Sequence, residues 1–223
     1  MSQPRREGCV RRLSRMSASG STARRAGLAV ALLLALGGGV AAGWNVDPPQ
    51  QVQHAGARLR VGLVGDGLLD GSGLPDAQSL PGLLAAARPD VLIVDDGLGH
   101  EGSDKVLARV RDATEAHLDV VVLWAGSYDA AAGVSPRQYA GYVGTLLDDV
   151  KGTRVVLLPP IGLRSGGGDV APYRAALQGV ARQHGIGVTA IDAALAGADW
   201  QDGGQDLGPR ANAALAGLLK GLL

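Results

Sequence analysis

From Arg60 to the end of the chain, short apolar runs alternate with segments whose apolar residues recur at helical spacing. Almost every residue in these runs is apolar, as expected of strands that helices cover on both faces. The runs that read as strands are residues 60–65, 91–94, 120–124, 154–158 and 187–191. This alternation predicts an α/β fold with a five-stranded parallel sheet between two helix layers, a three-layer α/β/α architecture.

The segments between these runs read as helices. Ser135 followed by Pro136 is typical of a helix N-cap with proline in the first turn, and Tyr139, Val143 and Leu147 then fall on one face. The other predicted helices cover residues 80–88, 103–117, 172–183 and 209–222. We expect residues 59–223 to fold as one domain.

The first 44 residues differ in composition from the rest. Residues 1–26 contain seven Arg and one Glu, and the stretch that follows, to Trp44, is uncharged. As a helix, residues 27–44 would span about 27 Å at 1.5 Å per residue, close to the thickness of a bilayer core. We expect this segment to be an uncleaved signal anchor or a signal peptide cut near Val40-Ala41-Ala42. The arginines would remain cytoplasmic as a basic tail, so the domain would lie outside the cytoplasmic membrane, either anchored or secreted.

Residues 45–58 contain Pro48-Pro49 and a Gln-rich run without apolar periodicity, which predicts a linker. Beyond residue 26 the chain carries 14 basic and 20 acidic groups, because seven Arg and one Glu lie before that point. We therefore expect no nucleic-acid partner. The single Cys excludes a disulfide framework within the chain and a zinc site built on cysteines.

Glycines and polar residues follow the predicted strands, at the sheet edge where such folds bind ligands. The sequences are VGDGLLDGSG from Val64, VDDGLGHEGSDKVLARV from Val94, VVVLWAGSYDAAAGVSPRQYAGYV from Val120 and DLGPRANAALAGLL from Asp206. In this order they resemble four motif blocks of the SGNH (GDSL) hydrolase family of esterases, lipases and carbohydrate deacetylases. The resemblance implies that residues 60–223 adopt the flavodoxin-like fold of that family.

The resemblance also implies where the reacting groups of the family would lie. Those groups are a nucleophilic Ser, an oxyanion-binding Gly and Asn, and a His oriented by an Asp. The corresponding positions hold Gly67, His100 (or Gly99 after a one-residue shift), Tyr128 and Asp206, while Asp202 fits the Asp position after a one-residue insertion. Glycine has no side chain that can attack an ester. We therefore expect a domain that is inactive by the serine mechanism and acts in binding or as a structural component of the cell envelope.

The expected pocket holds an acyl or carbohydrate ligand. It is lined by Asp66, Gly67, Gly99, His100, Tyr128 and Trp200. An alternative is an active esterase with a relocated nucleophile, Ser72 or Ser127, and His100 as its base. Turn formation is the simpler role for Ser72, and helix capping for Ser103.

A metal site is a third hypothesis, because carboxylates and one imidazole follow the strands. These residues are Asp66, Asp95, Asp96, His100, Glu101 and Asp129. An Asp close to a helix start commonly caps backbone N–H groups, and adjacent residues of a strand point to opposite faces. We therefore expect no metal and no cofactor.

Overall fold

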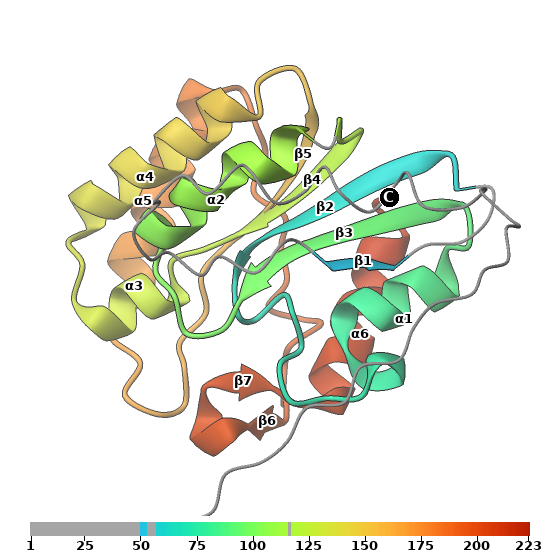
Figure 1. Ribbon diagram of the computed structural model, residues 1–223. Coiled ribbons are helices and arrows are strands. Elements are labelled where there is room, and N and C mark those ends of the chain that lie inside the picture. Colours follow the sequence, from blue (N-terminus) through green and yellow to red (C-terminus); the bar gives the residue numbers. More distant parts are fainter. Residues whose placement is uncertain (1–49, 53–56, 116) are drawn as a thin grey trace, which may run out of the picture. The chain divides into compact units, whose positions relative to one another are not determined.

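The computed structural model describes residues 50–52, 57–115 and 117–223. Its central element is a five-stranded sheet with the strand order β1-β3-β2-β4-β5 (Figure 1). Four of the strands run parallel: β2 (Leu59–Asp66), β3 (Val91–Leu98), β4 (Val120–Trp124) and β5 (Arg154–Leu158). These are the first four strands that the apolar runs predict.

The fifth strand differs from the prediction. It is β1 (Gln50–Val52), which pairs antiparallel with β3 and comes from the segment predicted as a linker. Residues 187–191 form no strand, and they meet β5 only through a bridge between Val188 and Leu157. In that run Ile191 alone is fully buried. The prediction of five parallel strands is therefore wrong, because residues 187–191 make only this bridge and the fifth strand of the sheet is antiparallel.

Helices cover both faces of the sheet, as predicted (Figure 1). One face packs against α1 (Leu80–Ala87) and α6 (Pro209–Lys220). The other packs against α2 (Ser103–Glu115), α4 (Pro136–Asp149) and α5 (Ala171–Gln183). The Ser135 hydroxyl accepts a hydrogen bond from the Gln138 N–H at 3.3 Å, which confirms the predicted cap of α4.

The two cores follow from the alternation of side chains along the strands. Leu63 belongs to the core under α1 and α6, and its neighbour Val64 to the core under α2, α4 and α5. Trp124 is fully buried in the first core, and its indole N–H donates to the Pro159 carbonyl at 2.8 Å.

Short elements gather beyond the carboxyl ends of the parallel strands. They are the 3₁₀ turns η1 (Asp76–Gln78) and η2 (Asp202–Gly204), the helix α3 (Ser127–Ala132) and the hairpin β6 (Trp200–Gln201) and β7 (Asp206–Leu207). In the hairpin, Trp200 lies opposite Leu207 and Gln201 opposite Asp206. These elements supply most of the polar side chains of the candidate site.

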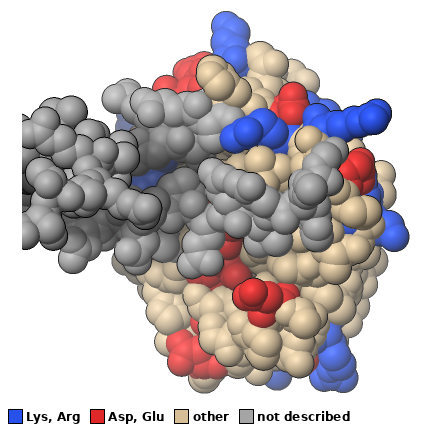
Figure 2. Space-filling view, turned by 45° about the vertical axis from the view of Figure 1, so that its right-hand side comes forward, with Lys and Arg blue, Asp and Glu red and all other residues tan. Residues whose placement is uncertain are grey.

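The predicted membrane segment, residues 27–44, and the basic tail before it lie outside the described residues. Within the described ranges, no helix combines the length and the apolar character that crossing a bilayer requires. In the view of Figure 2, Lys and Arg side chains lie toward the periphery and a group of Asp and Glu side chains lies near the centre.

Candidate functional site

The end of β2 is closed by backbone. A Cβ atom at Gly67 would lie 2.5 Å from the Gly99 Cα and 3.1 Å from the His100 nitrogen. No side chain fits at Gly67 unless the loop after β3 moves. The preceding Asp66 is fully buried, accepts a hydrogen bond from the Leu68 N–H at 3.3 Å, and has a pKa that burial raises well above its usual range. Asp66 thus belongs to the interior of the fold and does not line a ligand pocket.

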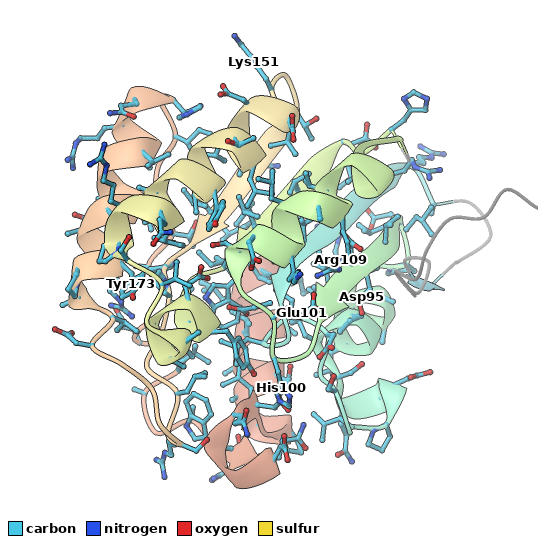
Figure 3. All side chains as sticks on the ribbon, turned by 60° about the vertical axis from the view of Figure 1, so that its left-hand side comes forward. Asp95, His100, Glu101, Arg109, Lys151 and Tyr173 are labelled. Atoms are coloured by element: carbon cyan, nitrogen blue, oxygen red, sulfur yellow. The ribbon has the colours of Figure 1, made fainter. Side chains whose placement is uncertain are left out.

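The loop after β3 presents His100, which Figure 3 labels below Asp95 and Glu101. Its backbone is left-handed, with φ of 62°. The imidazole Nε2 lies 3.2 Å from Asp202 Oδ2 and 3.4 Å from Asp206 Oδ2. One Nε2–H can donate to either carboxylate, which leaves Nδ1 to accept a proton.

Tyr128, in α3, lies against this group. Its hydroxyl is 3.1 Å from Asp206 Oδ1 and 3.0 Å from the Gln205 carbonyl oxygen, and its ring centroid is 5.5 Å from that of His100. Burial and the nearby Asp206 carboxylate raise the pKa of Tyr128, so the phenol stays a neutral donor. Tyr128 and Asp206 therefore orient each other, and the Tyr128 ring lies beside the His100 imidazole.

Ser72 lies on the loop after β2. Its hydroxyl donates to Asp70 Oδ2 at 2.6 Å, and its backbone N–H donates to Asp70 Oδ1 at 2.6 Å. Burial raises the pKa of Asp70, against the lowering effect of these two hydrogen bonds. A Cβ at Gly99 would lie 3.5 Å from the Ser72 Oγ, so this hydroxyl sits beside the residue that precedes His100.

An open cavity of about 370 Å³ brings several of these side chains together. It is lined by Ser72, Gly73, His100, Gln201, Asp202 and Asp206, and is called the Ser72 cavity below. Four of the predicted site residues meet here: Ser72, His100, Asp202 and Asp206. Asp70 was not predicted, although its place two residues before a serine in a glycine-rich turn is a recognisable hydrogen-bonding pattern.

Two other predicted residues lie elsewhere. Ser127 is fully buried, and its Oγ accepts a hydrogen bond from the Ile161 N–H at 3.1 Å. It supports the loop after β5 and is not among the residues that line the Ser72 cavity, so its burial does not favour Ser127 as a nucleophile. Trp200 lines a separate cavity, which shares no lining residue with the Ser72 cavity.

The carboxylates of the metal hypothesis do not converge. Asp129 accepts from the Ser103 N–H at 3.0 Å and from its hydroxyl at 2.6 Å, and Asp96 pairs with the buried Arg109 at 3.1 Å. Arg109 also lies 3.6 Å from Glu101, and the Asp95 carboxylate accepts from the Gly97 N–H at 3.0 Å. Each of these groups has a structural role.

A different set could hold a cation. One donor atom each from His100, Asp202 and Asp206 lies within 4.8 Å of the others. One imidazole nitrogen and two carboxylate oxygens suit a borderline divalent cation. The same three groups, without a cation, form a hydrogen-bonded imidazole that can carry a proton.

Comparison with known proteins places this geometry in a family. The lipase/acylhydrolase from Enterococcus faecalis has a similar fold, with a TM-score of 0.63, 17% identity, and coverage of 74% of this chain and 97% of that one. The psychrotrophic esterase EstA from Pseudoalteromonas sp. has a TM-score of 0.64 at 14% identity, over 73% of this chain and 94% of that one. No curated protein sequence matches the chain. Residues 63–214 match the GDSL-like Lipase/Acylhydrolase family, and the chain belongs to that family.

Proposed function

We propose that this protein is an acyl-ester hydrolase in which Ser72 is the nucleophile. The observation that carries the proposal is the 2.6 Å hydrogen bond from the Ser72 hydroxyl to Asp70, in a cavity that also exposes His100. A hydroxyl, an acceptor for its proton and a second proton carrier are the groups that acyl transfer requires. Family membership supports the same class of reaction.

The first half of the reaction forms an acyl-enzyme. The Ser72 Oγ attacks the ester carbonyl carbon and its proton passes to the Asp70 carboxylate. The tetrahedral intermediate then expels the alcohol, which takes a proton from the His100 imidazolium. A protonated His100 forms ion pairs with Asp202 and Asp206, 3.2 and 3.4 Å away.

The second half releases the acid. Water attacks the acyl carbon and gives a proton to the neutral His100. The Ser72–acyl bond breaks and the Ser72 oxygen recovers its proton from Asp70. One ester and one water thus become one acid and one alcohol, and both side chains return to their starting states.

The environment of Asp70 suits this role. Burial raises its pKa, so the carboxylate is a stronger base than an exposed aspartate. Asp70 must be ionised to accept the Ser72 proton. The rate is therefore expected to fall as the pH drops through this raised pKa.

The proposal is tested by hydrolysis of short p-nitrophenyl esters and acetylated sugars by the full-length chain. Ser72→Ala is expected to lower turnover at least roughly 10³-fold, since loss of a serine nucleophile can cost roughly 10⁶. Ser135→Ala, at the cap of α4 and outside the Ser72 cavity, is the matched control. Turnover that survives Ser72→Ala would refute the proposal, and a rate abolished by EDTA would point to a cation at His100 instead.

A second candidate is a domain that binds an acyl or carbohydrate ligand without cleaving it. It is favoured by Gly67, at the position where the sequence resemblance expects the nucleophile, because the backbone of Gly99 fills the space of a Cβ there. This candidate predicts no turnover by the wild type. Saturable binding of an acetylated sugar, equal in wild type and Ser72→Ala, would then support it.

We also propose that residues 27–44 carry the domain across the cytoplasmic membrane. The support is the uncharged stretch behind seven arginines. Fractionation of cells and mass determination of the mature N-terminus test this. A start after Ala42 indicates cleavage, and an intact chain in the membrane indicates an anchor. An intact chain in the cytosol would contradict the proposal.

A further inference from the structure

A second cavity, of about 290 Å³, is bordered by Trp200 of the β6–β7 hairpin. Its wall includes Ile161, Arg164, Arg174, Asp192, Leu195 and Trp200, and it is called the Arg164 cavity below. Its volume is at the lower end of the range for small-molecule sites, which suits a ligand of monosaccharide size.

The two cavities share one wall. Trp200 and Gln201 are successive residues of β6, and successive side chains of a strand point to opposite faces. Gln201 accordingly lines the Ser72 cavity and Trp200 the Arg164 cavity. The backbone N–H of Arg164 also donates a hydrogen bond to the Gly204 carbonyl at 2.9 Å, in the turn that carries Asp202. A molecule that extends across the hairpin could therefore contact both cavities.

The Arg164 cavity carries one uncompensated positive charge. Arg174 is neutralised by Asp192, with N–O distances of 2.8 and 3.1 Å, and its Nε–H donates to the Pro160 carbonyl at 2.8 Å. Arg164 is exposed, and among the described residues no carboxylate lies within ion-pair distance of it. The Arg164 guanidinium is thus available to an anion at this cavity, and a guanidinium binds carboxylates and phosphates bidentately.

The remainder of the wall suits a ring. The half-buried Trp200 indole, with Leu195 and Ile161, supplies flat and apolar surface, while Asp192 is largely exposed and can accept hydrogen bonds from hydroxyls. A fatty acyl chain would leave the Arg164 guanidinium without an anionic partner, because Arg174 and Asp192 already pair with each other. A ring that bears hydroxyls and one acidic group supplies an anion for Arg164 and hydroxyl donors for the exposed Asp192 carboxylate.

We infer that the Arg164 cavity binds an anionic saccharide, its ring on Trp200 and its carboxylate on Arg164. We further infer that this saccharide is a portion of the ester substrate, and only that statement rests on the proposed function. It narrows that substrate to an acylated sugar acid.

The experiment is calorimetric titration of the full-length chain with D-glucuronate and with D-glucose. Glucuronate is expected to bind at least tenfold more tightly than glucose, and Arg164→Gln is expected to weaken glucuronate binding at least tenfold. Arg182→Gln, at an exposed position of α5 outside both cavities, is the control and should bind as the wild type does. Trp200→Leu, checked for folding by its melting temperature, should lose binding of both sugars.

Ser72→Ala distinguishes a failure of the proposed nucleophile from a failure of the proposed saccharide site. It should lose ester turnover if Ser72 is the nucleophile, and it should bind glucuronate with wild-type affinity in either case. Equal binding of glucose and glucuronate, no binding by the wild type, or no effect of Arg164→Gln would overturn the inference. Benzoate or inorganic phosphate bound as tightly as glucuronate would also overturn it, because each lacks half of the proposed recognition.

Discussion

The carboxyl ends of β2 and β3 differ in what they leave open. After β2, Gly67 packs against the backbone of Gly99, with a virtual Cβ distance of 2.5 Å. After β3, His100 projects from a left-handed residue toward Asp202 and Asp206, beside an open cavity. The position at which the sequence resemblance expects the nucleophile is thus blocked by backbone, while a neighbouring loop presents an imidazole between two carboxylates. This difference directs the search for reacting groups to the loops that follow the neighbouring strands at the same sheet edge.

The largest expected effect comes from a substitution in the loop after β3, at His100. His100→Asn keeps a residue that tolerates the left-handed backbone and removes the proton carrier. Ester turnover should fall roughly 10²–10⁴-fold, with unchanged melting temperature. His184→Asn, at the end of α5, is the control for loss of an imidazole. Undiminished turnover in His100→Asn would remove His100 from the mechanism.

A smaller effect, on stability, is expected at Gly67, which follows the carboxyl end of β2. Gly67→Ser adds a hydroxyl where the sequence resemblance expects the nucleophile, but its Cβ would overlap Gly99, and overpacking of this kind costs about 3 kcal/mol. The variant should be less stable to urea and should gain no ester turnover. Gly141→Ser, in α4 with open space around the added atoms, should unfold as the wild type does. A stable and more active Gly67→Ser would show that the β2 end is not closed.

A third prediction concerns Asp95, which lies in β3 near the same sheet edge. Burial raises its pKa to about 7 from an unfolded value of 3.8. The folded state therefore retains a proton that the unfolded state releases, and stability should fall as the pH rises from about 4 through about 7.

Asp95→Asn keeps the acceptor for the Gly97 N–H and removes this titration. It should be more stable than the wild type at pH 8, by on the order of 2 kcal/mol. Asp148→Asn, at an exposed position of α4, is the matched control for the loss of one carboxylate. An unchanged profile for Asp95→Asn would mean that Asp95 is ionised in the fold.

The smallest effect is expected for Tyr128→Phe. It removes a hydroxyl that lies 3.1 Å from Asp206 and leaves the ring in place. The free energy of unfolding should drop by about 1 kcal/mol. If Tyr128 orients Asp206, turnover should fall while the substrate KM stays unchanged; a rise in KM alone would instead assign Tyr128 to substrate binding.

The sequence predicted those parts of the fold in which buried side chains follow a regular period. Strands β2 to β5 and the α4 cap belong to this class. It failed for β1, because three residues of a Gln-rich segment pair through their backbone and need no apolar pattern. It also missed α3, which starts after Gly126 at φ of 113° without a side-chain cap.

Only part of the candidate site was predicted from the sequence, because the rest depends on how the loops approach one another. His100 was recognisable as a histidine at a strand end, and Asp202 and Asp206 through the motif spacing. The role of Asp70 depends on the loop folding back so that its carboxylate is half buried against Ser72. The closure of Gly67 depends on how near two loops approach. Neither distance is encoded in local periodicity.

The most direct test of the account is the position of a covalent label. The full-length chain is treated with a fluorophosphonate, digested and mapped by mass spectrometry, in parallel with Ser72→Ala. The account predicts a phosphonate adduct on Ser72 in the wild type and no adduct in the variant. An adduct on another serine, or ester hydrolysis by a chain that takes up no label, would contradict it.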